Sequence, residues 1–164
     1  MKITAVASPN FSRRTRDIPV SCVVLHADAS DSAAKSVSWI KSKESKVSYH
    51  VLVDRDGTVF RFVETQHRAW HCGASVFEGQ SNVNDFSIGL SFANRNDGVE
   101  PYTDLQYEVG AVVCSAWMKV YPAITLDRIT THALVATPAG RKNDPRGFDL
   151  ARFKALVVAE QTKS

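Results

Sequence analysis

The segment VSCVVLH, residues 20–26, is a short apolar run rich in valine that predicts a buried strand at the centre of the fold. A second buried strand is predicted over residues 86–93, which read FSIGLSFA. Residues 48–54 and 58–63 are predicted to pair as a hairpin about the turn at Arg55, Asp56 and Gly57. The first strand ends at His26, so a titratable side chain stands where the chain leaves the sheet.

Helical segments alternate with these strands. A helix is predicted over residues 31–43 with Asp31 as its cap, and a longer helix runs from Thr103 to Tyr121, just before Pro122. Residues 129–132 are predicted to be extended, residues 137–147 form a loop, and Asp149 precedes a last helix over residues 150–160. Interleaved strands and helices predict an α/β fold, with one domain over residues 1–164, a core of about residues 20–160, and a central mixed β-sheet flanked by helices.

The composition is that of an ordinary soluble domain, with 44% hydrophobic residues, 23% charged residues and a net charge of +3. No apolar run approaches the ~18 residues that a membrane span needs, and residues 1–17 hold no stretch of signal-peptide length. We therefore expect a chain that is made in the cytoplasm and has no membrane span. The basic residues are scattered, apart from Arg13, Arg14 and Arg16, and predict a solvated face.

The three cysteines exclude two classes of small protein. Cys22, Cys72 and Cys114 are an odd number without a C-x-x-C pair, which argues against a disulfide framework and against a cysteine-rich zinc finger. Cys22 and Cys114 lie in apolar runs, so we expect them to pack in the core.

Among the five histidines, His26 and His132 stand out because each ends a short apolar run. A polar loop that contains Asp144 follows His132. Two imidazoles and one carboxylate are a ligand set suited to catalytic zinc, because three protein ligands leave a fourth position open. Composition and spacing alone leave two interpretations open, a metal site and a set of packed, hydrogen-bonded histidines.

Four segments carry a family resemblance that covers about residues 23–153. They are VVLH (23–26), VSYH (47–50) with DRDGTV (54–59), RAWHCG (68–73) with NDFSIG (84–89), and TH (131–132) with GRKNDP (140–145) and FD (148–149). In this order they resemble the zinc N-acetylmuramoyl-L-alanine amidases, which include phage lysozyme-type amidases, cytosolic anhydro-muropeptide amidases and peptidoglycan recognition proteins.

The resemblance implies one zinc ion per chain, held by His26, His132 and Asp144. It also implies catalytic roles for Lys142, two residues before the third ligand, and for Tyr49. The activity implied is hydrolysis of the amide bond between N-acetylmuramic acid and L-alanine in bacterial peptidoglycan. The residues alone leave Lys142 open as a solvated loop lysine and Tyr49 as a half-buried strand tyrosine.

One position departs from the family pattern. Many bacterial members carry a glutamate general base where this chain has Ser91, and a serine hydroxyl is a poor base at neutral pH. Trp70 and His71 lie in the segment that borders the cleft and are candidate substrate contacts, although Trp70 suits core packing equally. His50 is interpreted as structural and His67 as a surface residue.

Of the functions that fit, we place a phage endolysin first, because the chain is one small domain without a signal peptide or a wall-binding module. The alternatives are a cytosolic muropeptide-recycling amidase with the same chemistry, or a peptidoglycan-binding protein without activity. No recognition helix or alternation of aromatic and basic residues suggests a nucleic-acid partner. Nothing in the sequence demands more than a monomer.

Overall fold

The computed structural model describes residues 2–15 and 17–163. Arg16, one of the three N-terminal arginines, lies outside the described residues. The elements, in chain order, are β1 (Ile3–Ala5), β2 (Phe11–Arg13), β3 (Cys22–Ala27), α1 (Ala33–Lys41), η1 (Lys43–Ser45), β4 (Val51–Val53), β5 (Val59–Arg61), β6 (His67–Ala69), β7 (Val76–Phe77), β8 (Gln80–Ser81), η2 (Val83–Asp85), β9 (Ser87–Phe92), α2 (Asp104–Val120), η3 (Leu126–Arg128), β10 (Ile129–Thr131), α3 (His132–Val135) and α4 (Leu150–Thr162).

The described residues form a central mixed sheet of six strands in the order β1-β5-β4-β9-β3-β10. Strands β4, β9, β3 and β10 run parallel, and β5 pairs antiparallel with β4 through the predicted hairpin. The predicted buried strands β3 and β9 lie side by side at the centre, and every residue of both is buried. The expected α/β fold with a central mixed sheet is therefore confirmed.

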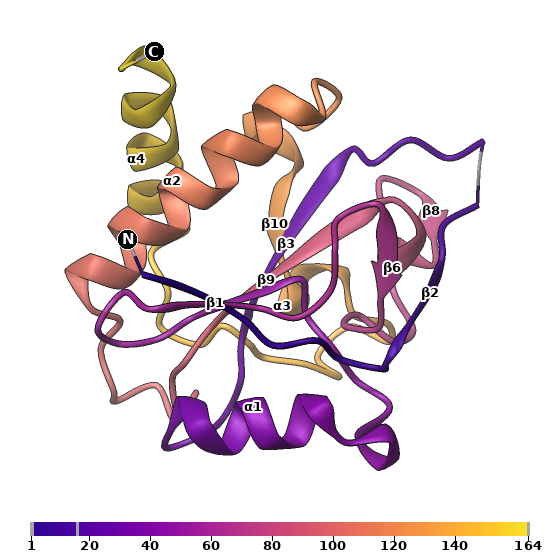
Figure 1. The fold of residues 1–164 in the computed structure, drawn as a ribbon. Coiled ribbons are helices and arrows are strands. Elements are labelled where there is room, and N and C mark those ends of the chain that lie inside the picture. The colour runs from indigo at the N-terminus through magenta and orange to yellow at the C-terminus, as the bar shows by residue number, and fades with distance from the viewer. Residues whose placement is uncertain (1, 16, 164) are drawn as a thin grey trace.

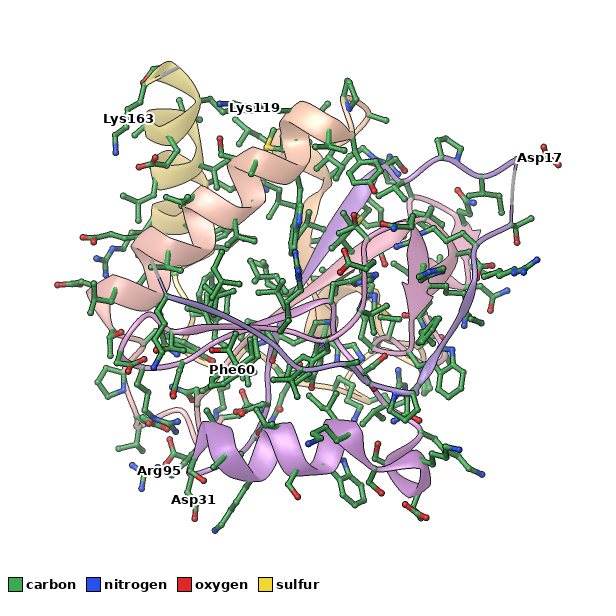
Figure 2. The ribbon with its side chains drawn as sticks, in the orientation of Figure 1. Asp17, Asp31, Phe60, Arg95, Lys119 and Lys163 are labelled. Atoms are coloured by element: carbon green, nitrogen blue, oxygen red, sulfur yellow. The ribbon has the colours of Figure 1, made fainter. Side chains whose placement is uncertain are left out.

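Helices cover both faces of the sheet, as Figure 1 shows, with α2 and α4 on one side and α1 on the other. Side chains alternate between the faces along each strand. Val23 and Leu25 of β3 pack in the core beneath α2 and α4, whereas Cys22 and Val24 point to the other face, as His26 does. Charged side chains, among them Asp31 and Lys163, project outward (Figure 2).

Several element boundaries differ from the sequence predictions; the strand predicted over residues 48–54, for example, begins only at Val51. Helix α1 begins at Ala33 after Ser32, whose hydroxyl accepts the backbone N–H of Lys35; Asp31 is not the cap and instead pairs with the Lys35 ammonium at 2.7 Å. The extended segment predicted over residues 129–132 ends one residue early, because His132 begins the short helix α3. The predicted caps Thr103 and Asp149 are confirmed, and Thr103 forms a capping box with Gln106.

Arg14 contradicts the expectation of a solvated basic face. Its guanidinium donates to the backbone carbonyls of four residues, Thr65, Asn84, Asp85 and Ser87, at 2.8–3.2 Å. Burial lowers its pKa to about 10, because desolvation disfavours the charged form. Arg14, which directly follows β2, therefore fastens this N-terminal strand to the turn before β6, to η2 and to the start of β9. No described helix is long and apolar enough to cross a membrane.

Candidate active site

The carboxyl ends of two neighbouring parallel strands bring distant histidines together. Strand β10 pairs with β3 in the register Ile129 to Val23, so the ends of both strands lie at the same edge of the sheet. His26 lies near the end of β3 and His132 follows β10 directly. Polar groups that follow adjacent parallel strands converge in this way in open α/β sheets. The loop bearing Asp144 joins them through its backbone carbonyl, which accepts from Ala133 N at 2.9 Å.

His26, His132 and Asp144 form a buried cluster whose ligand atoms all lie within 4.8 Å of one another. The Nδ1 atoms of both histidines face the same carboxylate. His132 Nδ1 lies 3.0 Å from Asp144 Oδ1, and His26 Nδ1 lies 3.3 Å from Asp144 Oδ2. The structure thus brings together all three predicted metal ligands.

The hydrogen-bonding groups of this cluster are consistent with a metal ion. His26 Nδ1 is buried and has no hydrogen-bond partner among the described residues. His132 Nδ1 faces a carboxylate while its Nε2 lies 3.0 Å from the Cys72 carbonyl, so both ring nitrogens face acceptors. A neutral imidazole carries one N–H and satisfies only one of them. A cation coordinated by the two Nδ1 atoms and Asp144 would give His26 Nδ1 a partner. It would also leave the single proton of His132 on Nε2, where it can be donated to the Cys72 carbonyl.

The electrostatics favour the protonation states that metal ligands need. Burial lowers the pKa of His26 to about 4, so its ring is neutral at physiological pH. Burial opposes ionisation of Asp144, but its contacts with His132 and His26 outweigh that effect and lower its pKa. Neutral imidazoles and an ionised carboxylate are the forms that bind zinc.

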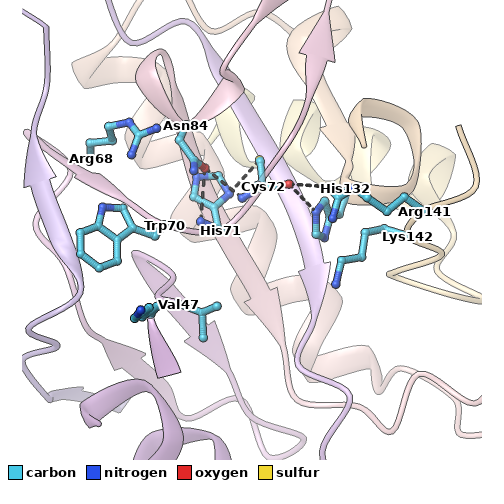
Figure 3. Close-up of a pocket in the computed structure, with 11 residues that line it drawn as sticks. Val47, Arg68, Trp70, His71, Cys72, Asn84, His132, Arg141 and Lys142 are labelled. Carbon is cyan, nitrogen blue, oxygen red and sulfur yellow. Dashed lines mark hydrogen bonds between the residues drawn. The ribbon is translucent and has the colours of Figure 1, made fainter. Parts of the chain in front are cut away.

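The two predicted catalytic residues border this cluster. The half-buried Tyr49 ring lies 5.1 Å from the His26 ring, centroid to centroid. Burial is the main cause that raises the Tyr49 pKa, so its hydroxyl keeps its proton. Lys142 is exposed and lines the same cleft as His132 (Figure 3). Ser91 is fully buried beside His26 in the strand register, and no ionisable group replaces the family glutamate at that position.

A cleft of about 480 Å³ opens beside the cluster. Its lining residues are Lys46, Val47, Arg68, Trp70, His71, Cys72, Gly73, Asn84, His132, Arg141 and Lys142. Four of these side chains are cationic and none is acidic; because Arg68 is ion-paired with Asp85, the other three give the cleft a positive charge that suits an anionic ligand. Trp70 is half-buried on its wall, and its indole Nε1 donates to Ser12 Oγ at 3.2 Å.

The remaining histidines have different environments. His50 is fully buried, accepts from Gly89 N at 2.9 Å and lies 3.0 Å from the His67 carbonyl, which agrees with its structural interpretation. His67 is half-buried rather than a free surface residue, because its ring packs on Phe11 at 4.9 Å. His71 lines the cleft yet is buried, with Nδ1 2.9 Å from His26 Nε2.

Sequence reasoning missed Arg141 as a residue that shapes the cleft. Its guanidinium donates to the carbonyls of Cys72 and Ala74 at 2.8 Å and to that of Thr137 at 2.9 Å. These contacts fasten the loop that bears Asp144 to the segment behind His132. A basic residue in a polar loop carries no sequence signal for such long-range partners.

Comparison with known proteins defines the class to which this fold and site belong. A family model described as N-acetylmuramoyl-L-alanine amidase matches residues 16–147, so the chain belongs to the N-acetylmuramoyl-L-alanine amidase family. Among its relatives, 1,6-anhydro-N-acetylmuramyl-L-alanine amidase AmpD of Citrobacter freundii is 34% identical over 96% of this chain and 91% of its own length. A crystal structure of AmpD aligns with a TM-score of 0.78, covering 95% of this chain and 94% of that one.

Two further structures extend the comparison, and the first of them contains a substrate. AmiD of Escherichia coli, solved with the substrate anhydro-N-acetylmuramic acid-L-Ala-D-gamma-Glu-L-Lys, aligns with a TM-score of 0.74 at 25% identity, covering 88% of this chain and 60% of that one. A mutant endolysin from Bacillus subtilis aligns with a TM-score of 0.69 at 19% identity over 96% of this chain and 99% of that one, which supports the fold alone. The comparisons therefore favour the muropeptide-recycling alternative over the expectation of a phage endolysin.

Proposed function

We propose that this protein is a zinc-dependent amidase of the cytosol that acts on soluble 1,6-anhydro-muropeptides. It hydrolyses the amide bond between the lactyl group of N-acetylmuramic acid and L-alanine. The observation that carries the proposal is the convergence of His26, His132 and Asp144 in a chain that is 34% identical to an amidase named for that substrate.

His26 Nδ1, His132 Nδ1 and one Asp144 oxygen would hold the zinc ion, since these atoms face one another and lack other suitable partners. Zinc, when bound, acidifies a water molecule and polarises the scissile carbonyl. The protein's part is to present a neutral His26 imidazole, an ionised Asp144 carboxylate and the His132 ring in a buried cluster beside an open cleft.

Lys142 and Tyr49 act on the charge that develops when the carbonyl is attacked. The exposed Lys142 ammonium lines the open cleft together with His132 and stabilises the oxyanion by its positive charge. Tyr49 retains its proton because burial raises its pKa, so it serves as a hydrogen-bond donor and not as a base. Ser91 supplies no carboxylate, so this chain works without the family glutamate at that position.

The cleft supports an acidic muropeptide as substrate. A stem peptide with a γ-linked glutamate leaves carboxylates free, and the cleft presents the cationic side chains of Lys46, Arg68, Arg141 and Lys142. Such a field concentrates anionic ligands and speeds their encounter with the site. Trp70 adds an apolar ring to the same wall.

The test is mass spectrometry of products from two substrates, a purified 1,6-anhydro-muropeptide and intact peptidoglycan sacculi. We expect release of the free stem peptide from the soluble substrate at the higher rate, and loss of activity on chelation and in His132→Ala. Faster cleavage of sacculi would favour an endolysin instead. Binding of the muropeptide without any cleavage would make the protein a peptidoglycan-binding module and refute the proposal.

A further inference from the structure

The rear of the His26 ring faces a second buried histidine. His26 Nε2 lies 2.9 Å from His71 Nδ1, and His71 Nε2 lies 3.3 Å from Ser87 Oγ. His71 is 6% exposed and the other two residues are fully buried, so the chain of three side chains is shielded from water. The two imidazole rings meet edge to face, with centroids 5.0 Å apart.

The proton positions along this chain follow from the metal site. If His26 Nδ1 gives its lone pair to a metal, the ring proton must sit on Nε2 and be donated to His71 Nδ1. His71 then carries its own proton on Nε2, which points to Ser87 Oγ. In this arrangement each imidazole donates one N–H, and His71 Nδ1 is the acceptor for His26; the Cys72 sulfur lies 3.2 Å from the same nitrogen.

The backbone next to His71 provides a hydrogen-bond acceptor for the second histidine ligand, His132. The carbonyl of Cys72 lies 3.0 Å from His132 Nε2, the nitrogen opposite the metal-facing Nδ1. Asn84 Oδ1 accepts both backbone amides, at 3.2 Å from His71 and 2.9 Å from Cys72 (Figure 3). One anchored dipeptide therefore supplies an acceptor to each of the two histidine ligands.

We propose that His71 is a positioning residue for the metal site, which accepts the His26 Nε2–H and so fixes the tautomer and orientation of that ligand. This inference rests on the metal site proposed above. Partners of this kind hold ligand rings in place, and losing one typically weakens metal affinity ~10–100-fold. In this role His71 acts on the metal through His26.

An alternative use of the same groups is a second metal site, because His26, His71 and the Cys72 thiol also lie within 4.8 Å of one another. The geometry argues against it. His71 Nδ1 lies 2.9 Å from His26 Nε2, a distance typical of a shared proton, and the thiol is fully buried, where desolvation disfavours the thiolate that binds a metal. One zinc ion per chain is expected if His71 positions His26, whereas a second metal site would give two.

The experiment measures zinc affinity of the folded, zinc-free protein by competition with a chromophoric chelator. His71→Leu keeps a similar volume but removes the acceptor, and we expect affinity to fall ~10–100-fold. His71→Asn restores an acceptor oxygen near the position of Nδ1 and should recover most of that loss. His50→Leu removes an equally buried imidazole that touches no ligand, and should change affinity less than about threefold while it lowers thermal stability.

A second readout is nitrogen NMR of the zinc-loaded protein. We expect an exchange-protected His26 Nε2–H signal in the wild type that is lost or shifted in His71→Leu. Wild-type affinity in His71→Leu, or equal losses in the leucine and asparagine variants, would overturn the proposal, as would two zinc ions per wild-type chain. A wild type that binds no zinc would instead overturn the metal site itself, so the two failures are distinguishable.

Discussion

Gly89 gives His71 the room to lie against β9, and Gly89→Ala is therefore a sharp test of the site. A Cβ atom at Gly89 would lie 2.8 Å from His71 Cγ, 2.9 Å from Nδ1 and 3.0 Å from Cδ2. Atoms in favourable contact are ~3.5–4.0 Å apart, so the ring or the strand must move by roughly 0.7 Å. A displacement of that size is enough to stretch the 2.9 Å contact with His26 Nε2 beyond hydrogen-bonding distance.

The size of the steric clash sets the expected loss of stability. Overpacking of a buried site costs about 1–3 kcal/mol. In a domain of this size each kcal/mol lowers the melting temperature by about 2–4 °C, so the zinc-free Gly89→Ala protein should melt roughly 2–12 °C lower. Zinc affinity should fall ~10–100-fold, because the partner of His26 is displaced. Thermal unfolding followed by circular dichroism and chelator competition measure the two effects separately.

Gly110→Ala is the matched control. A Cβ at Gly110 of α2 would lie 2.7 Å from Phe92 Cε1, a similar clash in the core on the other face of the sheet. Neither glycine has a positive φ, so backbone strain does not separate the two variants. The control should lose stability and keep its zinc affinity. Unchanged affinity in Gly89→Ala, or equal losses of affinity in both variants, would show that the position of His71 does not control zinc binding.

Three other outcomes are expected. Lys142→Ala should lower kcat by roughly 10²–10³ with zinc content unchanged, because an oxyanion-stabilising cation is lost; steady-state kinetics at the wild-type rate would make Lys142 a bystander. Arg14→Met should lower the free energy of unfolding in urea by about 2–4 kcal/mol, because it strands several buried carbonyls, whereas the exposed Arg13→Met should cost less than about 0.5 kcal/mol. Zinc-free protein should lose stability as the pH falls from about 6.5 to about 3, since the folded state holds the pKa of His50 at about 3 and the unfolded chain binds the proton first. His50 alone should contribute on the order of 1 kcal/mol per pH unit in that window, and an equally steep pH dependence in His50→Gln would contradict this assignment.

The sequence predicted those elements whose patterns are local. The apolar runs at β3 and β9, the turn of the hairpin and the caps Thr103 and Asp149 each depend on neighbouring residues, and all were confirmed. Strands β1 and β2 were missed because each has three residues with the outer two exposed, which leaves no apolar alternation to detect.

The site depended on information that periodicity does not carry. His26 and His132 meet because β10 joins the sheet beside β3, and strand order cannot be inferred from the pattern of either strand. The resemblance to a known family named the ligands, but it did not foresee that His71 lies behind one of them. Arg14 was misjudged for the same reason, since its carbonyl partners belong to segments 51–73 residues away in sequence.

The adjacency of β3 and β10 has a consequence for how the protein matures. A metal ion held by His26 of β3 and by His132 and Asp144, which follow β10, would link an early part of the chain to a late one. The ligand set is complete only after residue 144 has left the ribosome. Metal binding would then require that β10 has paired with β3. The bound ion would raise the free energy of unfolding only of the fully synthesised domain. Incomplete or truncated chains that lack residue 144 would not gain this stabilisation and would be more susceptible to proteolysis.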